Sequence, residues 1–185
     1  MEAQVSLTPR IIDERQMDAA SDAGIKQGLC ACFPNDAAIF TRTRVWHGSA
    51  PAFSVLIEDA GWIIAHVGVV DRVIQAGAEE LRIAGVQNVF VRPEFRGRGL
   101  VDEVMRSAMA EAMQRRMDAG LLFCLPALER VYARTSWQTL PPRTIWASRA
   151  NGERYRLDEK NLLMFHSLAK EAFPAGTIDL NGDDW

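Results

Sequence analysis

Apolar residues recur along the chain with two periods, and this pattern predicts a mixture of strands and helices. Runs rich in β-branched and aromatic residues, bounded by glycine, proline and asparagine, are typical of strands. Short turns at 58–61, 76–77 and 151–152 predict antiparallel hairpins between neighbouring runs. The predicted strands cover residues 4–7, 53–57, 62–70, 72–75, 81–91, 121–125, 144–148, 155–157 and 162–165.

Helical spacing of apolar residues marks the segments between these strands. Residues 13–32 predict a helix that is interrupted near Gly24 and Gly28, because glycine is a poor helix former. A second helix is predicted over 100–119. No internal repeat or linker divides the sequence. We therefore expect one α+β domain over residues 1–185, in which helices flank a central sheet.

The composition is that of an ordinary soluble globular protein and excludes several classes of function. A formal net charge of −3 provides no basic surface for nucleic acid. The longest apolar run is too short to span a bilayer and the N-terminus lacks a leader, so we expect a cytoplasmic protein that does not bind membranes. Cys30, Cys32 and Cys124 form no CxxC pair and have no histidine at ligand spacing. We interpret them as reduced core thiols and predict no metal site.

The segment around residue 97 carries the clearest chemical signal. A predicted strand ends at a proline, and a basic glycine-rich loop then opens a helix. Glycines let backbone N–H groups approach an anion, and two arginines together with a helix N-terminus suit a pyrophosphate. By itself such a loop is also typical of a plain polar connection. Its residues are Val89, Phe90 and Val91 in the strand and Arg96, Gly97, Arg98, Gly99 and Leu100 in the loop.

A second motif follows at a fixed distance. The strand over 121–125 leads into a short predicted helix over 127–134 that carries Tyr132. This order resembles the GNAT superfamily of acyl-CoA-dependent N-acyltransferases, whose loop motif is Arg/Gln-x-x-Gly-x-Gly/Ala and whose later motif ends in Tyr-x-x-x-Gly-Phe. Two departures occur: Val101 stands where the loop motif has Gly or Ala, and Ser136-Trp137 stands where the later motif has Gly-Phe.

More specific similarities lie outside this core. The tail over 173–182 resembles that of the nodulation protein A family, N-acyltransferases that load a fatty chain onto a chito-oligosaccharide. Residues 63–66, the Arg96-Gly97 loop, the Tyr132 segment and the terminal Trp185 are similar to the aminoglycoside 2′-N-acetyltransferases. Both relatives acylate an amine on a sugar.

The resemblance implies a GNAT-type, mostly antiparallel sheet that splays between the strand ending at Val91 and the strand starting near Leu121. Acetyl-CoA, or another acyl-CoA, would be the co-substrate, with its pyrophosphate on the loop amides and its pantetheine arm along the open strand edge. An N–H there would stabilise the oxyanion during direct attack by an amine. The implied cofactor-binding residues are Val89, Phe90, Val91, Arg96, Gly97, Arg98, Gly99, Leu100 and Val101.

Three residues are the candidates for catalysis. Tyr132 would donate a proton to the leaving thiolate, or would serve only as a packing tyrosine. Gln87 stands where the aminoglycoside enzymes have an acid; an amide is no base, so it would hold a water or a substrate hydroxyl, or simply be a polar strand residue. Asp36 matches an acidic substrate contact of that family and would grip or deprotonate the amine, or cap its loop. For His47 and His66 we favour structural roles.

The acceptor side draws on the C-terminal tail. Asp184 and Trp185, with Asp179 and Asp183 nearby, place carboxylates beside an aromatic face that would suit a cationic amino sugar. A solvated, frayed terminus fits the same residues. Asp36, Asp184 and Trp185 are therefore the predicted substrate-binding residues.

The leading hypothesis is an N-acetyltransferase that acts on a small polar amine, first an amino sugar or aminoglycoside. A fatty-acyl transferase like nodulation protein A is the second enzymatic hypothesis. The third is a noncatalytic acyl-CoA sensor, which the glutamine at position 87 favours. The predicted partner is a small-molecule amine, and hydrophobic strands around Trp146 and Phe165 would permit a homodimer.

Overall fold

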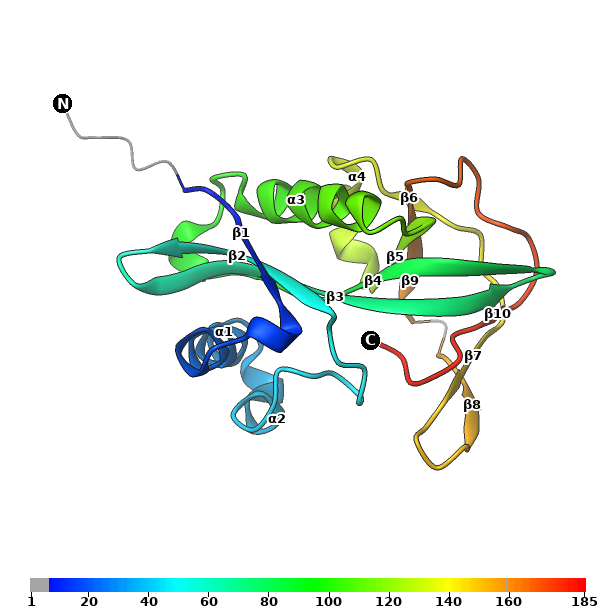
Figure 1. Cartoon of the computed structure of the whole chain (residues 1–185), viewed down its shortest axis with the longest axis horizontal. Helices are drawn as coiled ribbons and strands as arrows, with labels where there is room; N and C mark the ends of the chain where they lie inside the picture. Colours follow the sequence, from blue (N-terminus) through cyan, green and yellow to red (C-terminus); the bar gives the residue numbers. More distant parts are fainter. Residues whose placement is uncertain (1–6, 159) are drawn as a thin grey trace.

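The computed structural model describes residues 7–158 and 160–185 (Figure 1). The strands are β1 (Arg10–Asp13), β2 (Phe53–Asp59), β3 (Trp62–Ala76), β4 (Glu79–Val91), β5 (Ala119–Cys124), β6 (Gln138–Thr139), β7 (Ile145–Ser148), β8 (Arg154–Arg156), β9 (Leu162–Ser167) and β10 (Ile178–Asp179). The α-helices are α1 (Ala19–Cys32), α2 (Ala37–Phe40), α3 (Leu100–Gln114) and α4 (Glu129–Ala133). Short 3₁₀ helices are η1 (Glu14–Gln16), η2 (Pro34–Asp36), η3 (Pro93–Phe95) and η4 (Pro126–Leu128).

The described strands form one ten-stranded sheet. Its order is β6-β9-β5-β4-β3-β10-β7-β8, and β2 and β1 branch from β3. Only β4–β5 and β10–β7 are parallel pairs, as expected for strands joined by crossovers rather than hairpins. The prediction of an α+β fold with a mostly antiparallel sheet flanked by helices is confirmed.

Helices cover both faces of the sheet. Helix α3 lies on one face and α1 and α2 lie on the other (Figure 1). The buried residues of α3 recur every three or four positions, because residues at this spacing lie on the same side of a helix. This side of α3 faces the sheet. On the opposite face Ile25 and Leu29 of α1 are fully buried with Leu56 and Phe90. Each such side chain contributes about 1.5–3 kcal/mol. The C-terminal half of β4 is thus packed on both faces.

The N-terminal region differs from its prediction. The strand predicted over 4–7 lies outside the described residues except for Leu7, and the pattern did not predict β1. The helix begins at Ala19 rather than at residue 13. The reason is capping: the Asp18 carboxylate accepts a 2.7 Å hydrogen bond from the Ser21 N–H and fixes the first turn there.

Helix α1 also runs without the interruption predicted at Gly24 and Gly28. Both glycines face the sheet. A Cβ at Gly28 would lie 2.1 Å from the Phe90 ring, and one at Gly24 would lie 2.9 Å from Ile63. These glycines therefore permit close packing of α1, and they do not break it.

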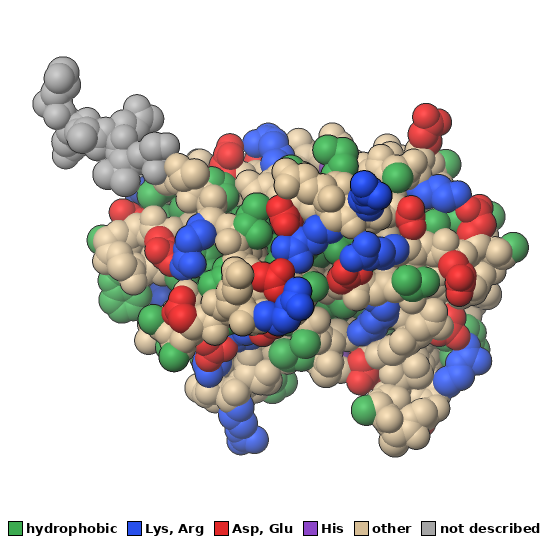
Figure 2. Space-filling model, viewed as in Figure 1, with side chains coloured by type: hydrophobic (Ala, Val, Ile, Leu, Met, Phe, Trp, Pro, Cys, Tyr) green, Lys and Arg blue, Asp and Glu red, His purple; other side chains and the backbone are tan. Residues whose placement is uncertain are grey.

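Elsewhere the strand prediction largely holds. The segments 62–70 and 72–75 form the single long strand β3, and the late hairpin and last strand appear as β7–β8 and β9. The residues proposed for a dimer contact are engaged within the chain: Phe165 is buried against Phe173, and Arg154 lies over the Trp146 ring. On the face shown in Figure 2, acidic and basic side chains are interspersed. Among the described residues, no helix is long and apolar enough to cross a membrane.

Candidate functional site

A gap opens in the middle of the sheet between β4 and β5. The two strands pair from Ile83 only as far as Val86, which lies opposite Leu122, whereas β4 stays paired with β3 as far as Val91. The last residues of β4 therefore have a free backbone edge on the β5 side. The predicted splay of the sheet is confirmed at this position.

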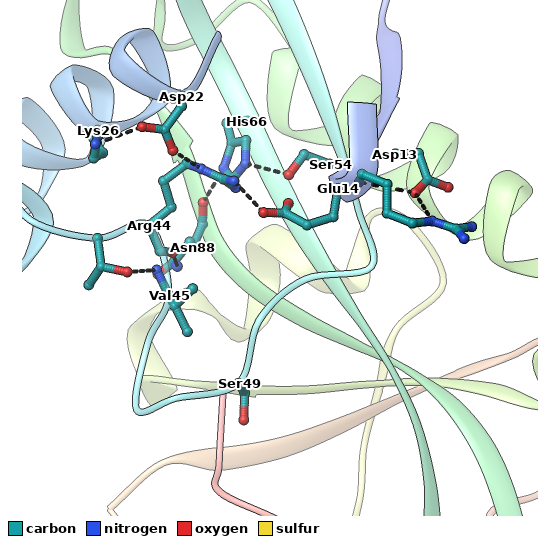
Figure 3. Close-up of polar contacts among 12 residues, drawn as sticks. Asp13, Glu14, Asp22, Lys26, Arg44, Val45, Ser49, Ser54, His66 and Asn88 are labelled. Atoms are coloured by element: carbon teal, nitrogen blue, oxygen red, sulfur yellow. Dashed lines mark hydrogen bonds and ion pairs between the residues drawn. The ribbon is translucent and has the colours of Figure 1, made fainter. Parts of the chain in front are cut away.

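A bulge in β4 marks the start of the gap. The register with β3 shifts between His66 and Gly68, and Asn88 has φ +54°. Its carbonyl accepts a 2.9 Å hydrogen bond from His66 Nδ1, and His66 Nε2 lies 3.2 Å from the Ser54 hydroxyl (Figure 3). Burial lowers the pKa of His66 to about 4, so the ring is neutral at physiological pH. His66 therefore has the structural role that we favoured from the sequence: its hydrogen bond to the Asn88 carbonyl stabilises the bulge.

A charge cluster around the buried Arg44 fixes the loop over 41–52 to the same bulge. The Arg44 guanidinium donates to Asp22 at 2.6 Å and to Glu14 at 2.5 Å (Figure 3). The Asn88 side-chain amide donates to the Arg44 carbonyl at 2.7 Å. Since buried pairs leave an uncompensated charge when one partner is lost, this cluster specifies where the loop must lie.

A cavity of about 690 Å³ lies where β4 meets α3. Of the predicted cofactor-binding residues, all but Arg98 line it. The Arg98 guanidinium instead lies 5.0 Å from the centre of the partly buried Phe95 ring. The strand edge and the glycine loop, which the sequence predicted to form one site, therefore line the same cavity.

The loop is built to present backbone donors. Gly97 and Gly99 both have φ +77°, a conformation that L side chains rarely adopt, and a Cβ at either position would meet open space. Within the described residues, no hydrogen bond uses the N–H groups of 97–101. Gly99 caps α3, so the positive end of that helix adds to the donors. Arg96 donates to the Val91 carbonyl at 3.2 Å. This arrangement suits a bound polyphosphate.

Tyr132 lies at the junction of this cavity with a second one. Its ring lines both, and its hydroxyl has no hydrogen-bond partner among the described residues. Burial raises the pKa of the Tyr132 phenol, so the group keeps its proton at physiological pH. Burial also raises the pKa of the neighbouring Cys124 thiol to about 11, which keeps it protonated and poorly nucleophilic.

The second cavity has a volume of about 730 Å³ and contrasting walls. One wall is a ladder of aromatic rings: Phe33 lies 5.9 Å from Phe40, Phe40 lies 5.7 Å from Trp46, and Trp46 stacks on His47 at 4.6 Å. Another wall is apolar and is formed by β4, β5 and the η4 segment that follows β5. Its residues are Val86, Val89, Leu122, Leu125 and Leu128.

Asp36 and Gln87, two of the predicted catalytic residues, both line this second cavity. Asp36 ends η2 and makes no capping hydrogen bond with its side chain. Gln87 is buried, and its amide is engaged: Nε2 donates to the Ser49 carbonyl at 2.6 Å, and Oε1 accepts from the Trp46 N–H at 3.3 Å. Gln87 thus fastens the loop over 41–52, with its polar atoms directed at backbone.

The C-terminal residues line the same cavity and are firmly packed. The Trp185 indole is buried against Gly85 and lies 5.7 Å from Phe123. Asp184 lies 2.7 Å from His47 Nδ1 and accepts from the Tyr155 hydroxyl at 2.8 Å. The expectation of a frayed terminus does not fit this packing.

Arg72 fastens the tail to the sheet. Its guanidinium donates to the Asp183 carbonyl at 2.5 Å and to the Ser49 hydroxyl at 2.9 Å, and it lies 5.4 Å from the Trp185 ring. The Ser49 hydroxyl also donates to the Asp183 carbonyl. The tail and the loop over 41–52 are therefore linked into one wall of the second cavity.

Sequence comparison places this architecture in a family. A profile of the nodulation protein A (NodA) family matches residues 4–147, which is most of the chain. This chain belongs to the NodA family. Nodulation protein A of Bradyrhizobium elkanii is 29% identical over 156 residues, covering 78% of this chain and 74% of that protein. Nodulation protein A of Rhizobium sp. (strain N33) is 36% identical over 61 residues, covering 33% of this chain and 31% of that protein.

Solved structures extend the comparison to the fold. The GNAT family N-acetyltransferase YhbS from Escherichia coli, crystallised with CoA, has a TM-score of 0.67 at 16% identity, with 98% of this chain and 94% of that chain covered. A GNAT family acetyltransferase from Brucella melitensis in complex with acetyl-CoA has a TM-score of 0.61 at 18% identity, with 93% and 95% covered. The recognition of a GNAT-fold N-acyltransferase of the NodA type is confirmed.

Some features of this NodA-family site were missed by sequence reasoning. Arg134 lines the first cavity and pairs with Asp102 in the first turn of α3 at 2.8 Å. In the sequence, the only sign of this ion pair was a basic residue two positions after Tyr132. The row of aromatic rings from Phe33 to Trp46 was also missed. These rings come from three short segments, and their contact depends on the charge cluster around Arg44.

Proposed function

We propose that this NodA-family protein transfers an acyl group from acyl-CoA to a primary amine of an amino sugar, by direct attack of the amine. One observation supports this most strongly. A loop of free amides and a cavity with aromatic and acidic walls meet at the open edge of β4, with the unpartnered Tyr132 hydroxyl between them. A donor on one side and an acceptor on the other would come together at that phenol.

The first cavity fits coenzyme A. The N–H groups of 97–101 would hold the pyrophosphate, and Arg96 would add a charge-assisted contact. The free edge of β4 would pair with the amide groups of the pantetheine arm, as a peptide adds to a sheet. Two structural neighbours are described in complex with CoA or acetyl-CoA, which supports the same ligand for this chain.

The chemistry would need no protein nucleophile. The amine nitrogen would bond to the thioester carbonyl carbon while an N–H at the β4 edge stabilises the oxyanion, a contribution of about 3 kcal/mol. The carbon–sulfur bond would then break, and Tyr132 would give its proton to the leaving sulfur. The protonated Cys124 argues against a covalent acyl-enzyme.

The lining of the second cavity supports an amino sugar, aminoglycosides included, as the proposed acceptor. Aromatic rings such as Trp46 offer a flat apolar face to a sugar ring, and the Asp36 carboxylate would attract the ammonium form of the amine. Asp184 and Trp185 would close the pocket from the tail side.

A second donor class is favoured by the apolar wall of the cavity. Acetyl would leave this wall empty, whereas a longer acyl chain would bury it at roughly 0.8 kcal/mol for each methylene. Membership of the NodA family points the same way. Acetyl-CoA and fatty acyl-CoA are therefore the two candidate donors.

The test is a thiol-release assay with acetyl-CoA and palmitoyl-CoA against glucosamine oligomers, aminoglycosides and simple polyamines. We expect release with at least one sugar amine, and the preferred donor then fixes the chain length. Calorimetric binding of CoA without any release would contradict the enzyme and select the noncatalytic sensor.

A further inference from the structure

We infer that His47, oriented by Asp184, accepts the proton of the attacking amine. The inference rests on the proposed function and deepens it, because acyl transfer to an amine releases a proton that some group must take. Neither Gln87, an amide, nor His66, whose two ring nitrogens are both engaged, is available for this step.

The geometry fixes the state of the His47 ring. Nδ1 lies 2.7 Å from Asp184 Oδ1, and an ionised carboxylate only accepts hydrogen bonds, so Nδ1 carries the proton. Nε2 then has a free lone pair, and among the described residues it has no partner. The His47 side chain is 50% exposed and lines the second cavity. A base oriented by a third group is the arrangement that activates nucleophiles in many enzymes.

Asp184 is itself held in place. The Tyr155 hydroxyl lies 2.8 Å from Asp184 Oδ1 and 2.9 Å from Asp183 Oδ1, and the Asp184 N–H donates back to Tyr155 at 3.4 Å. Burial raises the pKa of the Tyr155 phenol, so it remains a donor. Arg72 fixes the adjacent Asp183 carbonyl. The carboxylate therefore keeps a single orientation toward the imidazole.

The backbone at His47 supports a functional role independently. The Ser49 N–H donates to the Trp46 carbonyl at 3.0 Å and closes a tight turn. Its central residues have φ +44° at His47 and φ +87° at Gly48, a combination that favours asparagine followed by glycine. A histidine here is strained, and such strain concentrates at sites of function.

The attacking species is the neutral amine, formed when the bound ammonium gives one proton to water. As the amine nitrogen bonds to the carbonyl carbon, one N–H proton passes to His47 Nε2. The carbon–sulfur bonding pair leaves with sulfur, which receives the Tyr132 proton. The imidazolium and the phenolate then return to neutrality by exchanging a proton through water.

The experiment compares H47N with the wild-type chain. Asparagine tolerates the left-handed turn, so Tm should be unchanged or higher, while kcat/KM for the sugar amine should fall roughly 100-fold and the Kd of CoA should stay within about twofold. H166N is the matched control, since His166 lies on β9 outside both cavities, and its kcat/KM should not change. Wild-type kcat/KM in H47N would overturn the inference and leave the proposed function standing. No turnover by the wild-type chain would instead contradict the proposed function.

A second readout does not depend on turnover. Nitrogen-15 NMR of the histidine rings should show His47 with its proton on Nδ1, and D184A should move the proton to Nε2. D184N, whose side-chain oxygen still accepts, should keep the tautomer and part of the rate. A wild-type His47 that carries its proton on Nε2 would overturn the inference even if the enzyme is active.

Discussion

The two cavities that meet at Tyr132 are built in different ways. Most of the first comes from one continuous stretch, 89–102, in which a strand, a glycine loop and a helix follow one another. The second is assembled from parts that lie far apart in the chain: the region between α1 and β2, the bulge of β4, residues 122–125 and 128, residues 155–158, 160 and 161, and the last two residues of the chain. A local motif can therefore build the donor side, whereas the acceptor side depends on long-range contacts.

The difference extends to how each side is held. The glycine loop leaves its N–H groups free for a ligand, while the wall of the second cavity is tied by hydrogen bonds from Arg44, Gln87 and Arg72. Free N–H groups on the loop suit a co-substrate that is held by its phosphates. A rigid second cavity suits selective binding of the amine. We expect changes on one side to leave binding on the other side almost intact, except at the residues that line both cavities. These are Phe33, Val89 in the bulge, Leu128 and Tyr132.

The largest expected effect is on stability and concerns the bulge. The pKa of His66 is about 4 in the folded chain and about 6.5 when unfolded, so as pH falls from 6.5 to 4 the unfolded chain binds the proton first. The free energy of unfolding should fall by about 3 kcal/mol over this window. H66N keeps a donor but has no titrating ring, and urea denaturation should show that it lacks this part of the slope. Equal slopes in the two proteins would contradict a neutral buried His66.

Removal of the Tyr132 hydroxyl tests the junction of the cavities. Y132F should lower kcat by roughly 100-fold, about 2.7 kcal/mol, since the leaving sulfur loses its proton donor. Calorimetric Kd values for CoA and for the amine should stay within about twofold, because the ring still packs. An unchanged kcat would mean that Tyr132 only packs and that another group protonates the thiolate.

Loss of a cation on the donor side should weaken CoA alone. R96A should raise the Kd of CoA about tenfold, the value of one charge-assisted contact, with the KM of the amine unchanged. R98A should have a smaller effect, because Arg98, whose guanidinium lies over the Phe95 ring, does not itself line the cavity. Arg106, which lies on α3 outside both cavities, supplies the control R106A, which should bind CoA normally. Normal CoA binding by R96A would show that the loop amides suffice.

The smallest expected effect concerns the acceptor side. D36N should raise the KM of a cationic amine about fivefold and leave the Kd of CoA unchanged, because one partly exposed carboxylate is lost. D59N removes a carboxylate outside both cavities and serves as the control. An increase in the Kd of CoA in D36N would break the separation of the two sides.

The same contrast explains what could be predicted from the sequence. The cofactor-binding residues predicted within 89–101, apart from Arg98, line one cavity with Tyr132, because a strand, a loop and a helix that follow one another in the chain form most of that cavity. The strand β1 was missed since its pairing with β2 is set by distant packing. Gly28 was misjudged as a helix breaker because the Phe90 ring beneath it is invisible in a linear pattern. The pairing of His47 with Asp184, 137 positions apart, depends on where the tail folds back.

The most direct test of the central claim is mass spectrometry of a glucosamine oligomer incubated with the protein and an equimolar mixture of acetyl-CoA and palmitoyl-CoA. The account predicts an oligomer carrying one amide-linked acyl group, formed by the wild-type chain and far more slowly by Y132F. An oligomer that remains unmodified while CoA binds would contradict a site in which the two cavities join an acyl donor to a sugar amine.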